Sequence, residues 1–434
     1  MINAIATQLK SILDNKTELI ELKDADAYWQ HKISQAVITS DNIFLVFPNT
    51  VEALAKIVQE AALNQWRILI CGNGSKLAWG KTSKDIQLVI SLQKCDRLVE
   101  HAVGDLTVTV EAGMKLADLQ QELRSHNQFL PLDPSYPDTA TLGGIVATAD
   151  TGSWRQRYGG VRDLLLGLSF VRADGSIAKA GGRVVKNVAG YDLMKLFTGA
   201  YGTLGIISQL TFRTYPLIQT SSTLVITGKA ASIAQATQTI RNSGMTPTAL
   251  DLLSTQVVNN LGLGKEIGLM IRWETIPASI EQQQKQIIAI AEQLNLVINH
   301  YQDQASTKLW HQCSKITTMP NSVGNVTCKI GIASTAAVSF LQLQQITELD
   351  IAVRIHASSG VGTLQLEQIN FQAIAAMRSH CEKNRGFLSI LDAPQSVKEE
   401  FDVWGYKGNA LKPMQMIKNQ FDPQNILNCD RALV

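Results

Sequence analysis

The stretch that decides the fold reads GGRVVKNVAGYDLMKLFTGAYGTLGII and runs from Gly181 to Ile207. Glycines recur along it, and it runs into an apolar strand pattern at Ile206 to Phe212. Two earlier glycine-bearing stretches also border strand patterns. Gly72 to Lys76 directly follows one, and Thr139 to Gly160 leads to another at Leu165 to Val171. Because glycine adopts backbone angles that other residues avoid, such loops can turn their N–H groups toward a ligand.

Short strands and helices alternate around these loops. Ile43 to Phe47 predicts a strand, and the apolar spacing after Val51 predicts a helix with Asn49 as its cap. Arg67 to Ile70 predicts the strand before the first glycine loop. Leu106 to Val110 alternates apolar residues with threonine, which predicts a half-buried strand.

The pattern changes after Pro216. Glycine becomes sparse, and apolar strands alternate with amphipathic helices such as the one predicted over Ile280 to Leu294. We therefore expect two domains flanked by shorter segments. The expected segments are an N-terminal helical part over 1–40, a first domain over 41–216, a second, α+β domain over 217–402 and a C-terminal part over 403–434 that returns to the first domain.

Length and composition narrow the class of protein. The chain has 434 residues, more than one hydrophobic core usually serves. Hydrophobic residues make up 45% and charged residues 18%, with a formal net charge of +2, which is typical of a globular protein and not of a disordered or nucleic-acid-coating one. The cysteines are scattered without a C-x-x-C pair, which favours buried thiols in a reducing compartment over an iron–sulfur cluster.

The N-terminal sequence does not have the pattern of a secretory leader. MINAIATQLKSILDNKTELIELKDADAYWQ mixes acids and amides with its apolar residues and lacks a long apolar core before a small-residue cleavage site. No stretch approaches the ~18 uninterrupted apolar residues that a membrane-spanning helix needs. We expect a cytoplasmic protein that reaches a membrane only through partners.

The first two glycine loops suit a phosphate-bearing cofactor. Gly72 to Lys76 offers successive N–H groups, a hydroxyl and a charge to an anion, although a simple tight turn is the alternative for this loop alone. It matches neither the P-loop nor the dinucleotide fingerprint. Asp133 to Thr148 combines prolines, small hydroxyl residues and a Gly-Gly pair, so a planar ring could lie against its backbone. The alternative is a loop that packs on its own helix.

The order of residues in the third stretch resembles the FAD-dependent 2-hydroxyacid oxidoreductases of the vanillyl-alcohol oxidase superfamily. The similar motifs are Lys-Asn-x-x-Gly-Tyr-Asp-Leu from Lys186 and Gly-Thr-Leu-Gly-Ile-Ile from Gly202. The resemblance is collinear from Ile43 to Phe212, and the tail from Phe421 resembles the closing segment of the superfamily. Gly74 to Gly80 and Gly181 to Asp192 are most similar to the E subunits of bacterial glycolate oxidase.

This resemblance implies the fold and the cofactor. The fold would be α+β, with a two-part PCMH-type FAD-binding domain over 41–216 and an α+β cap domain with a ferredoxin-like antiparallel sheet over 217–402. FAD would be bound non-covalently, because Lys76 lies where covalent members carry an attachment histidine. The residues expected to hold FAD are Gly72, Asn73, Gly74, Ser75, Lys76, Leu77, Pro134, Ala140, Thr141, Leu142, Gly143, Gly144, Ala147, Thr148, Gly202, Gly205 and Ile206.

The sequence departs from the family where the metal site is expected. Fully catalytic members carry a His-x-Gly-Asp-Gly-Asn-x-His segment, whereas the counterpart from His356 to Gln365 lacks the Asp and the second His. We therefore expect no metal site. Arg354 and His356 share one face of a strand pattern, which suggests a carboxylate anchor and a base. The favoured alternative is that both face solvent or a domain interface.

Four further residues near these motifs have alternative interpretations. Arg183 and Lys186 are candidates for contact with substrate or flavin phosphate, with an ordinary surface role as the alternative. Trp154 and Tyr158 are interpreted as packing residues near the flavin.

Three functions are compatible with the sequence. In the first, the chain is the FAD-binding subunit of a glycolate oxidase complex, which oxidises glycolate to glyoxylate and passes electrons through flavin to a partner. Its partners would be a catalytic flavin subunit and an iron–sulfur subunit. In the second, the chain alone is an FAD-dependent dehydrogenase of glycolate or D-lactate. In the third, it is a structural subunit without flavin, which the intact glycine motifs disfavour.

Overall fold

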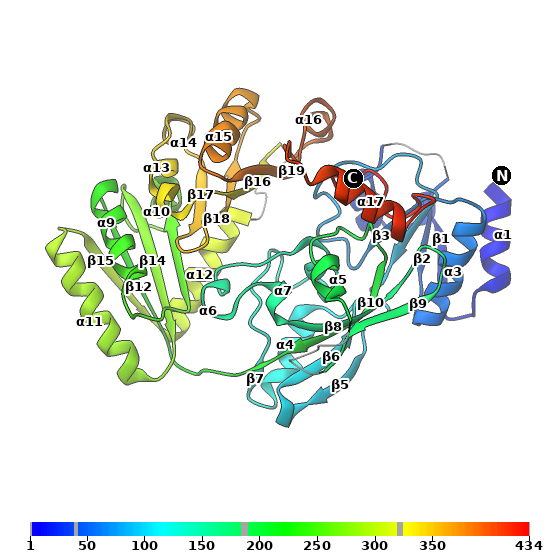
Figure 1. Cartoon of the computed structure of the whole chain (residues 1–434), viewed down its shortest axis with the longest axis horizontal. Coiled ribbons are helices and arrows are strands. Elements are labelled where there is room, and N and C mark those ends of the chain that lie inside the picture. The colour runs from blue at the N-terminus through cyan, green and yellow to red at the C-terminus, as the bar shows by residue number, and fades with distance from the viewer. Residues whose placement is uncertain (1, 39–41, 184–189, 319–323, 434) are drawn as a thin grey trace. The chain divides into compact units, whose positions relative to one another are not determined.

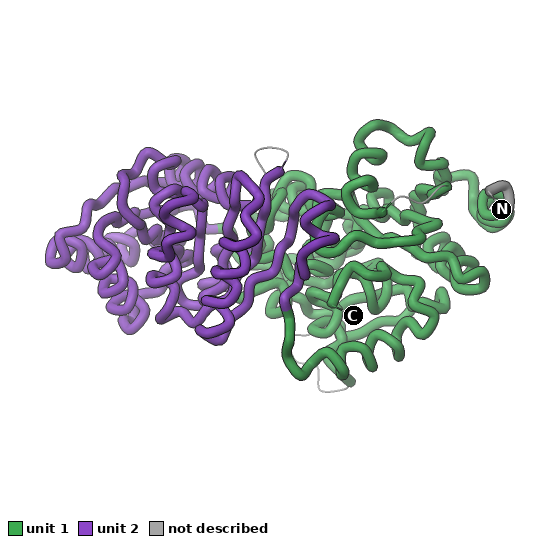
Figure 2. Tube along the Cα trace, turned by 90° about the horizontal axis from the view of Figure 1, so that it is seen from above, with its two compact units in different colours: residues 1–151, 159–217, 406–434 green, residues 152–158, 218–405 purple. Residues whose placement is uncertain are grey.

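The computed structural model describes residues 2–38, 42–183, 190–318 and 324–433. These residues form two compact units, which Figure 2 distinguishes by colour. Unit 1 consists of Met1–Thr151, Gly159–Leu217 and Tyr406–Val434, and unit 2 of Gly152–Tyr158 and Ile218–Gly405. The short segment Gly152–Tyr158 therefore belongs with unit 2, although the sequence pattern had assigned it to the first domain.

Unit 1 contains a small mixed sheet in the order β1-β2-β4-β3 (Figure 1). The last three strands are parallel and β1 is antiparallel to β2. The strands are β1 (Glu18–Glu21), β2 (Phe44–Phe47), β4 (Leu88–Ser91) and β3 (Ile68–Cys71). β2 and β4 are buried along their whole length, as is typical of parallel strands covered on both faces.

Helix α3 (Val51–Leu63) connects two of the parallel strands, but its predicted cap is wrong. Thr50 is the N-cap, and its side chain accepts a hydrogen bond from the Ala53 backbone N–H at 3.1 Å. Asn49 instead accepts a hydrogen bond from the Thr17 hydroxyl at 3.3 Å. Sequence spacing could not separate two adjacent residues that both favour the cap position.

A second sheet of unit 1 is antiparallel, in the order β5-β6-β10-β8-β9. The strands are β5 (Leu98–Ala102), β6 (Thr107–Glu111), β10 (Ile206–Arg213), β8 (Leu165–Val171) and β9 (Ile177–Gly181). The expectation of a half-buried β6 is wrong, since all of its residues are buried. Two of its polar side chains are paired, because the Thr109 hydroxyl lies 2.9 Å from that of Thr211 and Glu111 contacts Arg97 at 2.6 Å.

The remaining elements of unit 1 are helices and a two-stranded pair. The helices are α1 (Ile2–Ile12), α2 (Ala27–Ser34), α4 (Leu116–Arg124), α5 (Leu142–Thr148), α7 (Val161–Leu164), α8 (Leu193–Phe197) and α17 (Leu411–Phe421). β7 (Gln128–Phe129) pairs with β11 (Tyr215–Pro216). After α17 the chain returns to the mixed sheet, where Leu427 bridges to Ile68 (Figure 1).

Unit 2 is built on an eight-stranded antiparallel sheet in the order β15-β12-β14-β13-β17-β18-β16-β19. Its strands are β12 (Ser221–Gly228), β13 (Ala249–Leu253), β14 (Ile267–Glu274), β15 (Val297–Gln302), β16 (Val326–Gly331), β17 (Ala352–His356), β18 (Val361–Leu366) and β19 (Phe387–Asp392). Its helices are α6 (Arg155–Tyr158), α9 (Ala230–Arg241), α10 (Thr255–Asn260), α11 (Pro277–Gln293), α12 (Asp303–Thr318), α13 (Ala337–Leu341), α14 (Gln344–Glu348), α15 (Phe371–Lys383) and α16 (Gln395–Glu400).

The two faces of this sheet differ. On one face, side chains such as Ile226 and Ile271 form a large apolar core with α9, α11, α13 and α15. On the other face, Val225 and Met270 pack with α10 and α12 in a smaller core. Successive residues of a strand point to opposite faces. The second face can therefore carry polar side chains beside its smaller apolar core, while the first face stays apolar.

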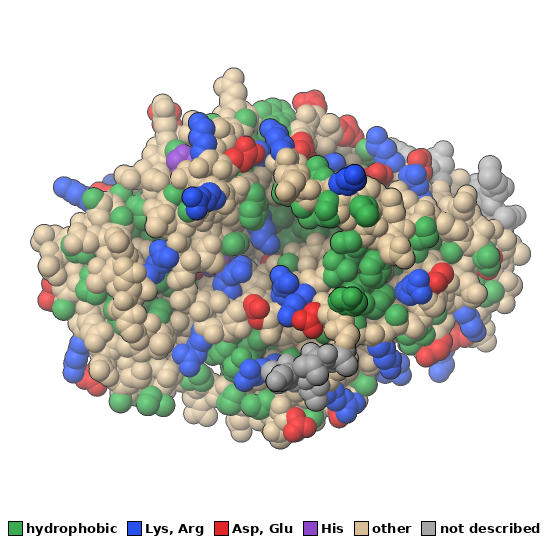
Figure 3. Space-filling view, viewed as in Figure 1, with side chains coloured by type: hydrophobic (Ala, Val, Ile, Leu, Met, Phe, Trp, Pro, Cys, Tyr) green, Lys and Arg blue, Asp and Glu red, His purple; other side chains and the backbone are tan. Residues whose placement is uncertain are grey.

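The architecture of both units confirms the predicted α+β class. Within the described ranges, no helix combines the length and the apolar character needed to cross a bilayer. Lys and Arg side chains are scattered among acidic and apolar ones over the face drawn in Figure 3, as the small net charge predicts.

Candidate functional site

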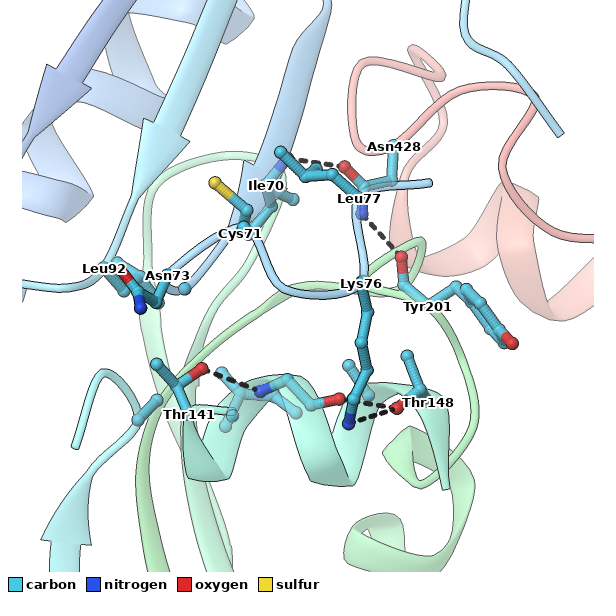
Figure 4. Close-up of a pocket in the computed structure, with 18 of the residues that line it drawn as sticks. Ile70, Cys71, Asn73, Lys76, Leu77, Leu92, Thr141, Thr148, Tyr201 and Asn428 are labelled. Atoms are coloured by element: carbon cyan, nitrogen blue, oxygen red, sulfur yellow. Dashed lines mark hydrogen bonds between the residues drawn. The ribbon is translucent and has the colours of Figure 1, made fainter. Parts of the chain in front are cut away.

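Unit 1 contains a pocket of about 780 Å³, a volume that includes open solvent at its mouth. We call it the glycine pocket, because glycines from all three predicted loops line it. The lining residues are Ile70, Cys71, Gly72, Asn73, Gly74, Ser75, Lys76, Leu77, Leu92, Ala112, Thr141, Gly143, Gly144, Ala147, Thr148, Tyr201, Gly202, Gly205, Ile207, Asn428 and Arg431. The fold thus brings together loops that lie far apart in the sequence (Figure 4).

Most of the residues predicted to hold the cofactor line this pocket. From the first loop these are Gly72 to Leu77; from the second Thr141, Gly143, Gly144, Ala147 and Thr148; and from the third Gly202 and Gly205. The other four, Pro134, Ala140, Leu142 and Ile206, are buried and are not among the lining residues.

Two glycines are needed because neighbouring atoms leave no room for a Cβ at their positions. A side chain at Gly72 would place its Cβ 2.0 Å from the Thr141 hydroxyl oxygen. One at Gly143 would lie 2.9 Å from the Ala112 carbonyl oxygen. Gly144 is different, since its nearest neighbour would be the Thr141 hydroxyl at 3.2 Å. Gly72 and Gly143 therefore let α5 approach the strand ends that form the pocket.

Lys76 is a buried charged residue of the glycine pocket. Its ammonium group lies 2.8 Å from Asp150, 3.4 Å from the Thr148 hydroxyl and 5.4 Å from the centre of the Trp79 ring. Asp150 also accepts a hydrogen bond from the Ser135 backbone N–H at 3.0 Å. Burial lowers the pKa of Lys76, although the negative charge of Asp150 acts in the opposite direction.

The C-terminal segment supplies the pocket residues that sequence reasoning missed most clearly. The Asn428 side-chain oxygen accepts a hydrogen bond from the Ile70 backbone N–H at 2.6 Å, and its amide donates to the Tyr201 carbonyl at 2.5 Å (Figure 4). Asn428 thereby ties the end of β3 to the third loop. Its φ of 44° lies in the left-handed region, which asparagine tolerates better than most residues. The Phe421 tail motif was recognised, but no local signal indicates these contacts.

Arg431 and Lys418 also contact the segments that carry the first and third loops. Arg431 donates hydrogen bonds to the carbonyls of Leu77, Trp79 and Lys81 at 2.6 to 2.7 Å. Lys418 donates to the Thr203 carbonyl at 3.0 Å and contacts Asp422 at 2.5 Å. The first and third loops are therefore held in place by residues from the end of the chain.

Arg354 and His356, the predicted catalytic residues, lie in unit 2 and contact a residue that the sequence did not suggest. Asp251 on β13 is fully buried, and its Oδ1 lies 2.8 Å from the His356 Nδ1. Its Oδ2 lies 3.9 Å from the Arg354 Nε and accepts a hydrogen bond from the Ser153 hydroxyl. We call these four residues the Asp251 cluster. Each of the two residues is 5% exposed, so the solvent-facing half of the alternative, solvent or a domain interface, is wrong.

The Asp251 carboxylate is stabilised in its charged form. Burial alone would raise the pKa of Asp251, but the charge and hydrogen bond of His356, together with Arg354 and Ser153, outweigh burial and lower it. In the described part of the chain, no group of three or more His, Cys, Asp or Glu side chains could hold a metal ion. The hydrogen bond between Asp251 and His356 can hold and orient a proton on the ring.

A second buried ion pair lies on the same face of the sheet of unit 2. Arg272 contacts Glu274 at 2.9 Å, and its guanidinium lies 6.0 Å from the centre of the Trp154 ring. Register places Arg272 opposite Ala249, two residues before Asp251 on the same face of β13. Burial raises the pKa of Glu274, against the opposing charges of Arg272 and Arg157. Trp154 thus packs on an arginine of unit 2.

Three other predicted residues have different outcomes. Arg183 donates a hydrogen bond to Glu100 at 2.7 Å, has a side chain that is 61% exposed and does not line the glycine pocket. Lys186 falls outside the described residues. Tyr158 is buried, and the Arg157 guanidinium lies 5.9 Å from its ring centre.

The first domain matches a known family. Residues 43–181 match the family described as FAD binding domain. The chain is 23% identical to glycolate oxidase subunit GlcD of Bacillus subtilis over 88% of its own length and 87% of that protein. It is 34% identical to subunit GlcE of Escherichia coli, over 40% of this chain and 49% of that protein. A mitochondrial D-lactate dehydrogenase [cytochrome] of Arabidopsis thaliana is 30% identical, and the match spans 46% of that protein.

Solved structures show the same fold. An alkyldihydroxyacetonephosphate synthase is similar with a TM-score of 0.73 at 15% identity, over 98% of this chain and 85% of that one. P-cresol methylhydroxylase is similar with a TM-score of 0.72 at 13% identity, over 99% and 96%.

The fold and the family match together define the class. Residues 43–181 match the FAD binding domain family, the fold is that of p-cresol methylhydroxylase, and the sequence is similar to glycolate oxidase subunits. The homologues include glycolate oxidase subunits and D-lactate dehydrogenases. The alignments span most of GlcD but only about half of GlcE and of the plant dehydrogenase.

Proposed function

We propose that FAD binds non-covalently in the glycine pocket. The convergence of all three predicted loops on one pocket within unit 1 supports this assignment. Backbone N–H groups of the first loop and the buried Lys76 suit a pyrophosphate, and Gly143 and Gly144 present bare backbone to a planar ring. The described residues that line the pocket include no histidine, the residue type to which the family resemblance assigns covalent attachment.

Acid precipitation of the purified protein tests this assignment. About one FAD per chain should appear as yellow flavin in the supernatant. Colour retained in the pellet would contradict non-covalent binding. A colourless protein that FAD does not reconstitute would support the third function, a structural subunit.

We further propose that the chain is the FAD-binding subunit of a glycolate-oxidising complex. The homology to GlcD and GlcE, which are glycolate oxidase subunits, is the observation that carries this proposal. The partners would be a catalytic flavin subunit and an iron–sulfur subunit. Bound FAD would accept two electrons from the oxidation of glycolate to glyoxylate and pass them on. The residues of this chain would bind the cofactor, hold the loops of its pocket in place through the C-terminal contacts, and hold the ring proton of His356 through Asp251.

Reconstitution tests the subunit role. The isolated chain should bind FAD but oxidise glycolate negligibly, and activity should appear when the other two subunits are added. A chain that does not bind to those subunits in size-exclusion chromatography would contradict the proposal. A cytoplasmic location, with any membrane contact made through those subunits, belongs to the same proposal.

The contact between Asp251 and His356 favours a second candidate function. A buried carboxylate that binds a histidine ring is a common arrangement for a general base, and the match to GlcD covers most of both chains. The chain alone would then be a dehydrogenase of glycolate or D-lactate. Anaerobic mixing of the lone chain with either acid should bleach its flavin under this alternative, and His356→Gln should abolish the bleaching.

A further inference from the structure

Strand pairing, and not a flexible loop, builds the contact between Asp251 and His356. In the register of β13 and β17 the two residues are direct partners, so both side chains point to the same face of the sheet. Asp251 is fully buried and His356 is 5% exposed. Two backbone strands therefore fix the separation of 2.8 Å between the carboxylate and the imidazole.

The remaining contacts determine which way the hydrogen bond runs. The Asp251 Oδ2 accepts from the Ser153 hydroxyl and faces the Arg354 Nε, and both of these groups are donors. An ionised carboxylate can only accept hydrogen bonds, so the Oδ1 must accept from the His356 Nδ1. The lowered pKa of Asp251 agrees with an ionised carboxylate in the folded protein.

The other ring nitrogen of His356 is left as the basic position. A neutral imidazole carries one proton, and a hydrogen bond from Nδ1 places that proton there and the lone pair on Nε2. Among the described residues, Nε2 has no hydrogen-bond partner, whereas Nδ1 has Asp251. The cluster therefore presents a single proton-accepting atom.

We propose that Asp251 is a positioning residue for His356. It holds the ring proton on Nδ1 and leaves Nε2 to accept the hydroxyl proton of a 2-hydroxy acid. That acceptance rests on the second candidate function, in which bound FAD would take the Cα hydrogen with its electron pair and Nε2 would take the hydroxyl proton. The position of the ring proton in the free protein does not depend on that function and is measured separately.

Asp251→Asn is the informative variant because it keeps the volume of the side chain. Ser153 and Arg354 are donors and claim the amide oxygen, so the amide NH₂ of the new residue faces the ring. A donor facing Nδ1 favours the tautomer that carries its proton on Nε2. A comparable exchange of a histidine's carboxylate partner in serine proteases is known to give the wrong tautomer. Glu274→Gln is the matched control, since it removes a buried carboxylate from the same sheet without touching His356.

Nitrogen-15 NMR of histidine-labelled protein is the decisive measurement. His356→Gln assigns the ring signals by their loss. In the wild type and in Glu274→Gln we expect a protonated Nδ1 and a bare Nε2 once the ring is neutral, whereas Asp251→Asn should reverse the two. A wild-type ring that is protonated on Nε2, or an Asp251→Asn spectrum identical to the wild type, would overturn the proposal. Circular dichroism verifies that each variant is folded.

Kinetics separate this inference from the proposed function. If the lone chain oxidises 2-hydroxy acids, Asp251→Asn should lower kcat roughly 10- to 100-fold with little change in KM or in FAD content. Unchanged kcat in Asp251→Asn would overturn the role of Asp251 in catalysis. If the wild-type chain bleaches with neither acid, the second candidate function fails while the measured tautomer still decides whether Asp251 positions His356.

Discussion

The glycine pocket and the Asp251 cluster use different parts of the chain to build a polar site. The pocket is lined by loops that carry several glycines and by the C-terminal tail. The cluster consists of side chains, and three of its four members stand on two paired strands. A site built from glycine-bearing loops can be recognised from the local order of residues in the sequence. A site built from side chains on paired strands becomes visible only when the structure shows which strands pair.

The buried charges of the two sites also differ in whether burial or the neighbouring groups determine the direction of the pKa shift. Burial dominates at Lys76, whose pKa is lowered in spite of Asp150. At Asp251 the neighbouring donors dominate, and its pKa is lowered in spite of burial. Lys76 therefore has more to gain from an added anion, which fits the proposed cofactor phosphates. Asp251 already has the partners that it needs, which fits a fixed positioning role.

The largest loss of stability should come from removing the negative charge that pairs with Lys76. Asp150→Asn leaves a buried ammonium group without its counter-charge, which we expect to cost about 3 to 5 kcal/mol of unfolding free energy. Urea unfolding monitored by circular dichroism measures this loss. Glu18→Gln is the control, because the exposed pair of Glu18 with Lys94 should contribute about 1 kcal/mol or less. Equal losses in the two variants would show that burial does not distinguish the pairs.

Removing the tie between β3 and the third loop should have the next largest effect. Asn428→Gly keeps the left-handed backbone but loses both side-chain hydrogen bonds, so we expect a loss of about 2 to 3 kcal/mol and weaker FAD binding. Isothermal titration with FAD and urea unfolding measure the two quantities. Asn428→Asp keeps the acceptor for Ile70 and should lose less. Unchanged FAD affinity in Asn428→Gly would remove the tail from the proposed binding site.

Neighbouring glycines in the pocket should respond differently. Gly143→Ala forces its Cβ against the Ala112 carbonyl and should cost about 1 to 3 kcal/mol of stability. Gly144→Ala places its Cβ 3.2 Å from the Thr141 hydroxyl, which must shift by a few tenths of an ångström, so the stability should change by about 1 kcal/mol or less. It should nevertheless lower the FAD content, because Gly144 lines the pocket. Normal FAD content in Gly144→Ala, or in the bulkier Gly144→Val, would contradict the proposed site.

The smallest effect concerns acid stability. Because the pKa of Asp251 is lower in the folded than in the unfolded chain, its contribution is fully present above the unfolded value of about 4 and is lost as pH falls through the folded value. Asp251→Asn should therefore lose less stability than the wild type between about pH 4 and pH 2. Urea midpoints across this range measure the slopes, and parallel slopes would show that Asp251 is not held in its charged form.

The sequence predicted features that depend on neighbouring residues better than features that depend on residues far apart in the chain. Local periodicity predicted β8 and the helix that is observed as α11, because alternation and helical spacing are properties of neighbouring residues. It failed at β6, where Thr109 is buried only because Thr211 lies across the sheet to pair with its hydroxyl. The burial of β6 depends on the strands that pair with it, and the sequence of one strand does not identify those strands.

The same limit applies to the candidate site. The family resemblance, which rests on the order of residues in the three glycine-bearing stretches, implied most of the residues that line the pocket. Asn428 and Asp251 were missed because each acts through partners more than a hundred residues away in the chain. Asp251 lies in an ordinary apolar strand, ALDLL, in which one acid suggests only an exposed position.

The excursion of Gly152–Tyr158 into unit 2 has a consequence for how this chain can be divided. A fragment that covers only Ile218–Gly405 would lack Ser153 and Trp154, so one donor to Asp251 and the ring over Arg272 would be missing. A fragment that ends at Leu217 would lack both the sheet on which this excursion rests and the tail that carries Asn428. Neither unit can therefore be exchanged as one continuous segment of the chain. A functional swap with a relative would have to exchange the seven-residue excursion together with the unit that receives it.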